Sequence, residues 1–218
     1  EIRMRIEVLK RDAEIDYWQQ ISKGIEPEPL RVSLESKLQQ LDDDFAFIAE
    51  CNEGGEFMAP EKMQRLARIA EYTWMRTLDD RLGVSWEESQ RQQKTAAQAL
   101  PVQEKLLADK AEHIIEREAG DKIPQDNPWG FKLDVPEYKY NRGELYNLSI
   151  EKGTLTTEER FKINDHIVQT IIMLENLPYP KHLADVPLVA GSHHEKMDGT
   201  GYPKCLTAAD MPLTARIM

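Results

Sequence analysis

The chain has 218 residues, of which 28 are Lys or Arg and 39 are Asp or Glu, so its formal net charge at pH 7 is −11. Hydrophobic residues make up 40% of the chain and charged residues 31%, which is typical of a folded globular protein and argues against disorder along the whole length. No apolar run approaches the roughly 18 residues of a membrane-spanning helix, and no basic-then-apolar start indicates a signal peptide. The acidic balance disfavours non-specific binding to long nucleic acid.

Two cysteines, Cys51 and Cys205, lie far apart in the sequence, and neither has a CxxC partner. A disulfide framework is therefore not expected, and a reducing, cytoplasmic setting is predicted. Helical patterns run into both ends of the chain, so we expect the chain to be a piece of a longer polypeptide.

The first two predicted elements are amphipathic helices over residues 1–22 and 30–51, separated by a Gly- and Pro-containing break at residues 24–29. Apolar residues recur at helical spacing in both. They are Ile2, Ile6, Leu9, Ala13 and Tyr17 in the first helix, and Leu34, Leu38, Leu41 and Phe45 in the second.

Proline and capping signals predict the next two helices. Pro60 suits the first turn of a helix that should reach about Leu82. Ser85 can cap a further helix over residues 86–100, with Glu88 completing a capping box. Several prolines then indicate irregular structure over residues 100–143, with a short strand or hairpin near residues 131–146.

A longer helix is predicted to begin at a cap on Thr156 or Thr157 and to end at Pro178. Its inner stripe should consist of Ile163, Ile167, Ile171 and Leu174, and His166 falls at the border of that stripe. A second helix is predicted over residues 182–194. A Gly-rich loop, a cap at Thr207 and a last helix from Pro212 should follow.

The segment His193–Pro203, HHEKMDGTGYP, carries the chemistry. Imidazole suits iron, manganese, nickel or zinc. Neighbouring histidines point about 100° apart on a helix, so they can contact two metals, or one metal and one ligand phosphate. Gly199 and Gly201 permit positive φ and close backbone approach, and Pro203 fixes the exit of the turn.

These eleven residues resemble the HHExxDGxGYP signature of the HD-GYP family, a branch of the HD superfamily of metal-dependent phosphohydrolases. Residues 153–156 and the helix through His166, 27 residues before His193, resemble the family's helix with a single metal-ligand histidine. The resemblance implies an all-α fold, an HD-domain-like helical bundle.

The family's His-Asp pair does not occur in the 218 residues. Either the domain is degenerate, or the pair lies upstream of Glu1. The run over residues 1–11 resembles a segment of large sensory HD-GYP proteins, which favours the second hypothesis. The chain would then divide into a helix of a split domain (1–20), a helical and irregular insertion (21–140) and the C-terminal part of the HD-GYP domain (141–218).

The resemblance implies hydrolysis of cyclic di-GMP to pGpG or GMP in a bacterial-type signalling protein, with this chain in the cytosolic part of a larger sensor. It implies two or three divalent metals, iron or manganese, in the intact domain. The implied metal ligands are His166, His193 and His194. The residues implied to lie beside the nucleotide are Asp198, Gly199, Gly201, Tyr202 and Pro203. Glu195 is implied to orient a ligand histidine.

Other interpretations stay open at this point. The domain could be a catalytically inactive module that binds cyclic di-GMP or docks a partner such as a diguanylate cyclase domain, or a phosphohydrolase of another nucleotide. A homodimer is also open. Residues 199–203 could form only a tight turn. We expect His113 and His182 to be surface residues, and Asp42–Asp44 to form a solvated face or a cap.

Overall fold

The computed structural model describes residues 1–124 and 126–217. This part of the chain is mostly helical, which confirms the predicted all-α class. The helices are α1 (Ile2–Ser22), α2 (Pro27–Glu53), α3 (Pro60–Ala70), α4 (Trp86–Gln92), α5 (Glu144–Leu148), α6 (Thr157–Glu175), α7 (Val186–Gly191) and α8 (Leu213–Ile217). Short 3₁₀ helices are η1 (Ala111–His113), η2 (Ala119–Asp121) and η3 (Lys181–Leu183).

The described strands form separate two-stranded sheets and do not join into one larger sheet. β1 (Gly55–Phe57) pairs with β6 (Lys152–Gly153), β2 (Thr73–Arg76) with β3 (Val102–Lys105), and β4 (Ile114–Glu116) with β5 (Tyr138–Asn141). No helix among the described residues is both long and apolar enough to cross a bilayer.

The chain folds into two compact units. Unit 1 comprises residues 1–115 and 141–154, and unit 2 comprises residues 116–140 and 155–218. The predicted division at residues 20 and 140 concerns which segments belong to one family domain. The contacts within the units do not test it, so it stays a prediction.

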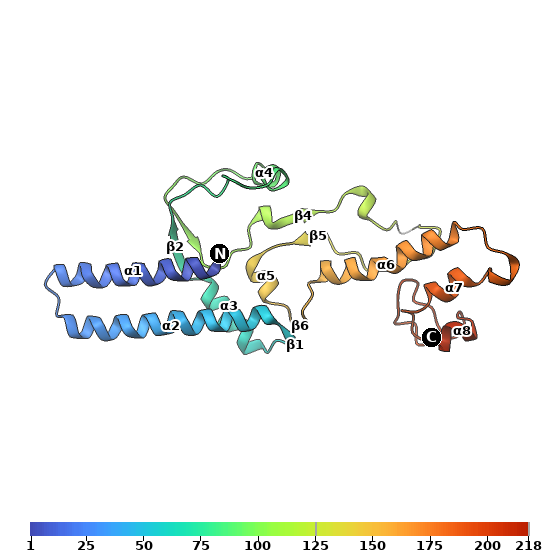
Figure 1. Ribbon diagram of the computed structural model, residues 1–218, viewed down its shortest axis with the longest axis horizontal. Helices are drawn as coiled ribbons and strands as arrows, with labels where there is room; N and C mark the ends of the chain where they lie inside the picture. The colour runs from blue at the N-terminus through green and yellow to red at the C-terminus, as the bar shows by residue number, and fades with distance from the viewer. Residues whose placement is uncertain (125, 218) are drawn as a thin grey trace. The chain divides into compact units, whose positions relative to one another are not determined.

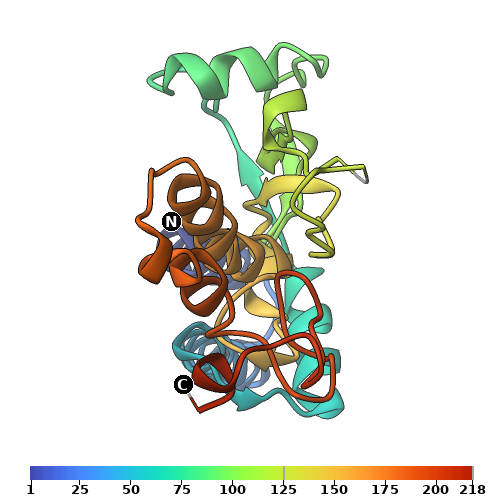
Figure 2. The ribbon, with the colours of Figure 1, turned by 90° about the vertical axis from the view of Figure 1, so that its right-hand side faces the viewer.

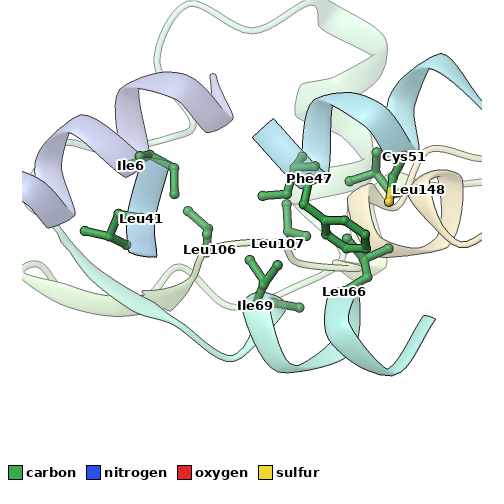
Figure 3. Close-up of a cluster of buried hydrophobic side chains, with 11 residues drawn as sticks. Ile6, Leu41, Phe47, Cys51, Leu66, Ile69, Leu106, Leu107 and Leu148 are labelled. Carbon is green, nitrogen blue, oxygen red and sulfur yellow. The ribbon is translucent and has the colours of Figure 1, made fainter. Parts of the chain in front are cut away.

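Unit 1 is built on the antiparallel pair of α1 and α2, which lie side by side (Figure 1). Both helices begin and end close to the predicted residues. Their apolar faces meet α3, α5 and the segment after β3, where Leu41, Leu66 and Leu106 are completely buried. Figure 3 shows these side chains pointing toward one another in a single cluster. Burial of such side chains is the main source of stability for this unit.

The third predicted helix is wrong beyond Ala70. The chain leaves the helix there and forms β2, whose residues Thr73 and Trp74 favour strands. β2 is anchored by a buried ion pair, in which Arg76 Nε lies 2.8 Å from Glu104 Oε1 of β3. This pairing over a long sequence separation overrides the helical periodicity of the segment.

The fourth predicted helix is correct at its start and wrong at its end. Ser85 accepts a hydrogen bond from the Glu88 backbone N–H at 3.2 Å, as the capping signal predicts. α4 nevertheless ends at Gln92, and residues 93–101 are irregular. The strand predicted near residues 131–146 is β5, but its partner is β4 and not a neighbouring strand of a local hairpin.

Unit 2 is organised around α6, and its start is the best-predicted feature of the fold. Thr156 Oγ1 accepts from the Glu159 N–H at 3.2 Å, and a Glu159 carboxylate oxygen accepts from the Thr156 N–H at 3.0 Å. Ile167 and Ile171 are buried as predicted, whereas Ile163 is 53% exposed. The buried stripe instead runs through Val168 toward Phe131, because apolar side chains of residues 129–133 pack on that face of the helix.

Two further predictions are wrong in the segment after α6. The helix expected over residues 182–194 is divided into η3 and the six-residue α7. Thr207 caps no helix; its N–H and hydroxyl both donate to Asp210 Oδ2 in a turn before α8. The last helix is present as α8, and Met218 lies outside the described residues.

We expect Thr156→Ala to lower the free energy of unfolding by about 1 kcal/mol, because the Glu159 N–H would lose its partner at the start of α6. Urea denaturation followed by circular dichroism measures this change. Thr157→Ala is the matched control, since Thr157 is exposed in the first turn and its loss should change the stability by less than about 0.5 kcal/mol. Equal effects of the two substitutions would contradict the capping role.

Candidate metal centre

Three histidines from two segments of unit 2 converge on one point. His166 lies in the middle of α6, and His193 and His194 lie in the turn that follows α7 directly. α6 and α7 pack against each other, and Figure 2 shows them in orange with the red segment that follows α7. The packing of these two helices therefore brings residues 27 and 28 positions apart into contact.

The three imidazole rings form a tight cluster. The ring centres of His193 and His194 are 4.0 Å apart, and the ring centre of His166 lies 5.0 Å from that of His194. Each ring offers a nitrogen, and these nitrogens all lie within 4.8 Å of one another. The structure thus brings together the three side chains that the sequence singles out as metal ligands.

Backbone carbonyls fix the orientation of two of the rings. His166 Nδ1 lies 2.6 Å from the carbonyl oxygen of Ile163, and His193 Nδ1 lies 2.7 Å from that of Ala190. A carbonyl oxygen only accepts, so each Nδ1 must carry the proton and donate it. In the neutral form of such a ring the opposite nitrogen, Nε2, carries the free lone pair, which is the tautomer that a metal-binding histidine needs.

His194 completes the cluster in a partly buried position. Its Nε2 lies 3.2 Å from His166 Nε2. Burial, and then the neighbouring His193 and His166 rings, hold the pKa of His194 below its ordinary value. The ring is therefore neutral at pH 7, and a neutral imidazole is the form that ligates a metal.

The spacing of these nitrogens fits a shared cation. Two imidazole nitrogens that bind one ion at about 2.1 Å and at right angles to each other stand roughly 3.0 Å apart. The 3.2 Å between His166 Nε2 and His194 Nε2 agrees with that geometry. Three protein ligands leave further coordination positions of the ion for water or a substrate oxygen, as in catalytic metal sites.

The glycine-containing loop folds back on this cluster. The Tyr202 ring stacks on His194 with centres 4.7 Å apart and planes at 16°, and the Tyr202 N–H donates to the His194 carbonyl at 3.2 Å. Gly199 has φ +79°, in the left-handed region. A Cβ on Gly201 would stand closer than 3.0 Å to backbone atoms of Glu195 and Lys196. Close approach, and not an unusual φ, is what requires glycine at position 201.

The two carboxylates of the loop hold it in shape. Asp198 Oδ1 accepts from the Thr200 hydroxyl at 2.7 Å and from its N–H at 2.9 Å, and these bonds lower the pKa of Asp198. The two oxygens of Glu195 accept from the N–H groups of Lys204 and Leu206 at 2.6 and 2.8 Å. Glu195 thus fastens the end of the loop, and its expected role in orienting a ligand histidine stays a prediction.

One segment beside the loop has no signal in the sequence. Phe131 packs in the same cluster as Tyr202, and the Lys132 N–H donates to the carbonyl of the buried Pro203 at 2.7 Å. Lys204 lies with its Nζ 5.8 Å from the centre of the Phe131 ring. Residues 131 and 132 lie about 70 positions before the loop, and no local pattern connects them to it.

The other histidines do not join the cluster. His113 is half-buried in η1, where its Nδ1 accepts from the Lys110 N–H at 3.2 Å. His182 is exposed in η3, as predicted.

Convergent imidazoles beside a tight loop are the mark of a histidine-ligated metal centre. Residues 101–218 match the family described as HD domain, which is more than half of the chain. The chain belongs to this family of metal-dependent phosphohydrolases and is HD-GYP-like.

A curated protein of Vibrio cholerae serotype O1 (strain ATCC 39315 / El Tor Inaba N16961), named "Probable cyclic di-GMP phosphodiesterase", is 32% identical over 77 residues. That match covers 33% of this chain and 18% of the relative's length. No solved structure matches the chain.

We expect His166→Ala to weaken the binding of Ni²⁺ by at least tenfold, because one of three convergent nitrogens is lost. Ni²⁺ is the probe because imidazole sites bind it more tightly than Mn²⁺ or Fe²⁺. Isothermal titration calorimetry measures the change. His182→Ala removes an exposed histidine outside the cluster and should leave the affinity unchanged; similar losses in both variants would argue against a single site.

Gly201→Ala should lower the free energy of unfolding by about 1–3 kcal/mol, because a methyl group there overlaps backbone atoms that cannot rotate away. Gly120→Ala is the control, since a Cβ on Gly120 meets no atom within 4 Å. Chemical denaturation compares the two. A Gly201→Ala variant as stable as Gly120→Ala would show that the backbone around position 201 has room for a side chain.

Proposed function

We propose that this chain forms part of a metal-dependent phosphodiesterase that hydrolyses cyclic di-GMP as the output domain of a bacterial-type signalling protein in the cytoplasm. The observation that carries the proposal is the convergence of His166, His193 and His194, with the Nδ1 atoms of two rings fixed to backbone carbonyls. Two rings held in this way, with the His194 ring beside them, would present lone pairs toward one point and leave room for a substrate.

The charges of the site support a metal-dependent mode of binding. Cyclic di-GMP carries two phosphodiester anions, and the chain has a net charge of −11. Neutral imidazoles supply no positive charge of their own. Divalent cations, for which we propose iron or manganese, would neutralise the phosphate and lower the pKa of a bound water when present. The part of the histidines is to hold those cations in place.

The loop residues would then shape the space beside the phosphate. Tyr202 covers one face of His194, which excludes water from that side of the ring and fixes its plane. The Asp198 carboxylate stays ionised, because Thr200 donates two hydrogen bonds to it. We propose that Gly199, Gly201 and Pro203 set the close backbone approach that a bulky nucleotide needs.

The substrate rests on the family and on the resemblance to the Vibrio cholerae protein, whose printed name gives the activity. We assign the activity to the whole polypeptide, with a His-Asp pair supplied by a part of the protein other than these 218 residues. The products we propose are pGpG or GMP.

A second function is favoured by the ligand count. Among the described residues, the cluster contains three histidines and no carboxylate. A domain that gained no further ligand would bind the nucleotide without hydrolysing it, or would dock a diguanylate cyclase domain through residues 199–203. A homodimer is compatible with either function.

The full-length polypeptide, supplied with Mn²⁺ or Fe²⁺, should convert cyclic di-GMP to pGpG or GMP, detected by liquid chromatography. His193→Ala should reduce turnover at least about a hundredfold, because the cation loses a ligand. His182→Ala should retain turnover. Nucleotide binding without turnover in the unaltered protein would refute the enzyme and leave the binding module.

A further inference from the structure

A cavity of about 320 Å³ lies within unit 2, between α6 and residues 117–124 and 127–140, and none of the three clustered histidines lines it. Sites for small organic ligands have volumes of roughly 300–1,000 Å³. The cavity is at the lower end of that range, which suits a mononucleotide better than a cyclic dinucleotide.

The charge of the lining is opposite to that of the chain. Four cations and two carboxylates border the cavity, in a chain whose net charge is −11. The cations are Arg117, Lys122, Lys139 and Lys162, and the carboxylates are Asp121 and Asp165. An excess of two positive charges at a concave site favours an anionic ligand.

Two of the cations are committed to the protein itself. Lys139 Nζ lies 2.8 Å from Asp121 Oδ2. Arg117 Nε donates to the Pro136 carbonyl at 2.7 Å, and its guanidinium lies 4.4 Å from the centre of the Phe161 ring. These contacts build the wall of the cavity and leave little of either charge for a ligand.

The other two cations are placed to meet a phosphate. Lys122 is exposed and forms no ion pair with any residue that the structure describes. Lys162 Nζ lies 3.9 Å from Asp165 Oδ2, which is a long distance for an ion pair, and the Lys162 side chain is exposed. Ion pairs of this kind hold a charge weakly. Each ammonium group can turn toward an anion at little cost.

An aromatic surface accompanies these cations. Trp129 lines the cavity and is half-buried, so part of its indole is accessible to a ligand. It is held by Phe131, whose ring lies 5.8 Å away at an interplanar angle of 12°. An indole fixed in this way is a platform on which a nucleobase stacks.

We infer that this cavity binds a nucleoside monophosphate, with the base on Trp129 and the phosphate between Lys122 and Lys162. The site uses no metal ligand, so it does not depend on the proposed hydrolysis. The same segment that carries Trp129 also carries Lys132, whose N–H donates to the Pro203 carbonyl. A bound nucleotide would therefore contact the segment that packs against the signature loop.

Titration of the full chain with GMP in EDTA, followed by calorimetry, tests the inference. Saturable binding is expected. Lys122→Met should weaken it about tenfold through loss of a charge-assisted contact, and Trp129→Leu by a similar factor through loss of stacking. Trp129→Phe should restore most of the affinity, which separates stacking from a change of fold. Lys181→Met, which removes an exposed lysine in η3, should have no effect.

Three results would overturn the inference. The first is the absence of saturable GMP binding in EDTA. The second is unchanged affinity in both Lys122→Met and Trp129→Leu, which would place the nucleotide elsewhere. The third is equal affinity for ribose 5-phosphate, which would leave an anion site without a base. None of these depends on turnover of cyclic di-GMP, so the cavity and the proposed activity can fail separately.

Discussion

The candidate metal centre depends on two short hydrogen bonds of the same kind, each from an imidazole Nδ1 to the backbone carbonyl three residues earlier. In His166 this carbonyl belongs to α6, and in His193 it belongs to the end of α7. Each bond selects the tautomer and fixes the ring plane, which a free histidine side chain would lose to rotation. Because the helices themselves supply the acceptors, the positions of both nitrogens follow from the packing of α6 on α7.

Short-range signals in the sequence predicted only those parts of this arrangement that depend on residues close together in the chain. The capping box of Thr156 and Glu159 fixed the start of α6 correctly, because both hydrogen bonds form within four residues. The signature segment identified His193, His194 and the glycines, and the resemblance of the helix after residues 153–156 identified His166. The convergence of the rings could not be derived from spacing alone, since neighbouring histidines on a regular helix would diverge. It follows from the turn that ends α7 at Gly191.

The wrong predictions of helix ends and buried faces have a common physical cause, which is contact between residues distant in the chain. β2 replaces the end of a predicted helix because Arg76 forms a buried ion pair with Glu104, 28 positions later. The exposed Ile163 and buried Val168 show that the inner face of α6 is set by residues 129–133, which carry no helical or signature pattern. The same segment supplies Phe131 and Trp129 to the wall of the cavity, so the least predictable part of unit 2 is also the part that gives it a concave surface.

The loop that follows the paired histidines is closed by its own bonds. Glu195 clamps Lys204 and Leu206, the His194 carbonyl receives the Tyr202 N–H, and Gly201 leaves space that no side chain could share. None of these bonds involves a cation. Because these bonds already hold the loop, a cation bound by the three histidines would change the electrostatic potential of the site far more than its conformation.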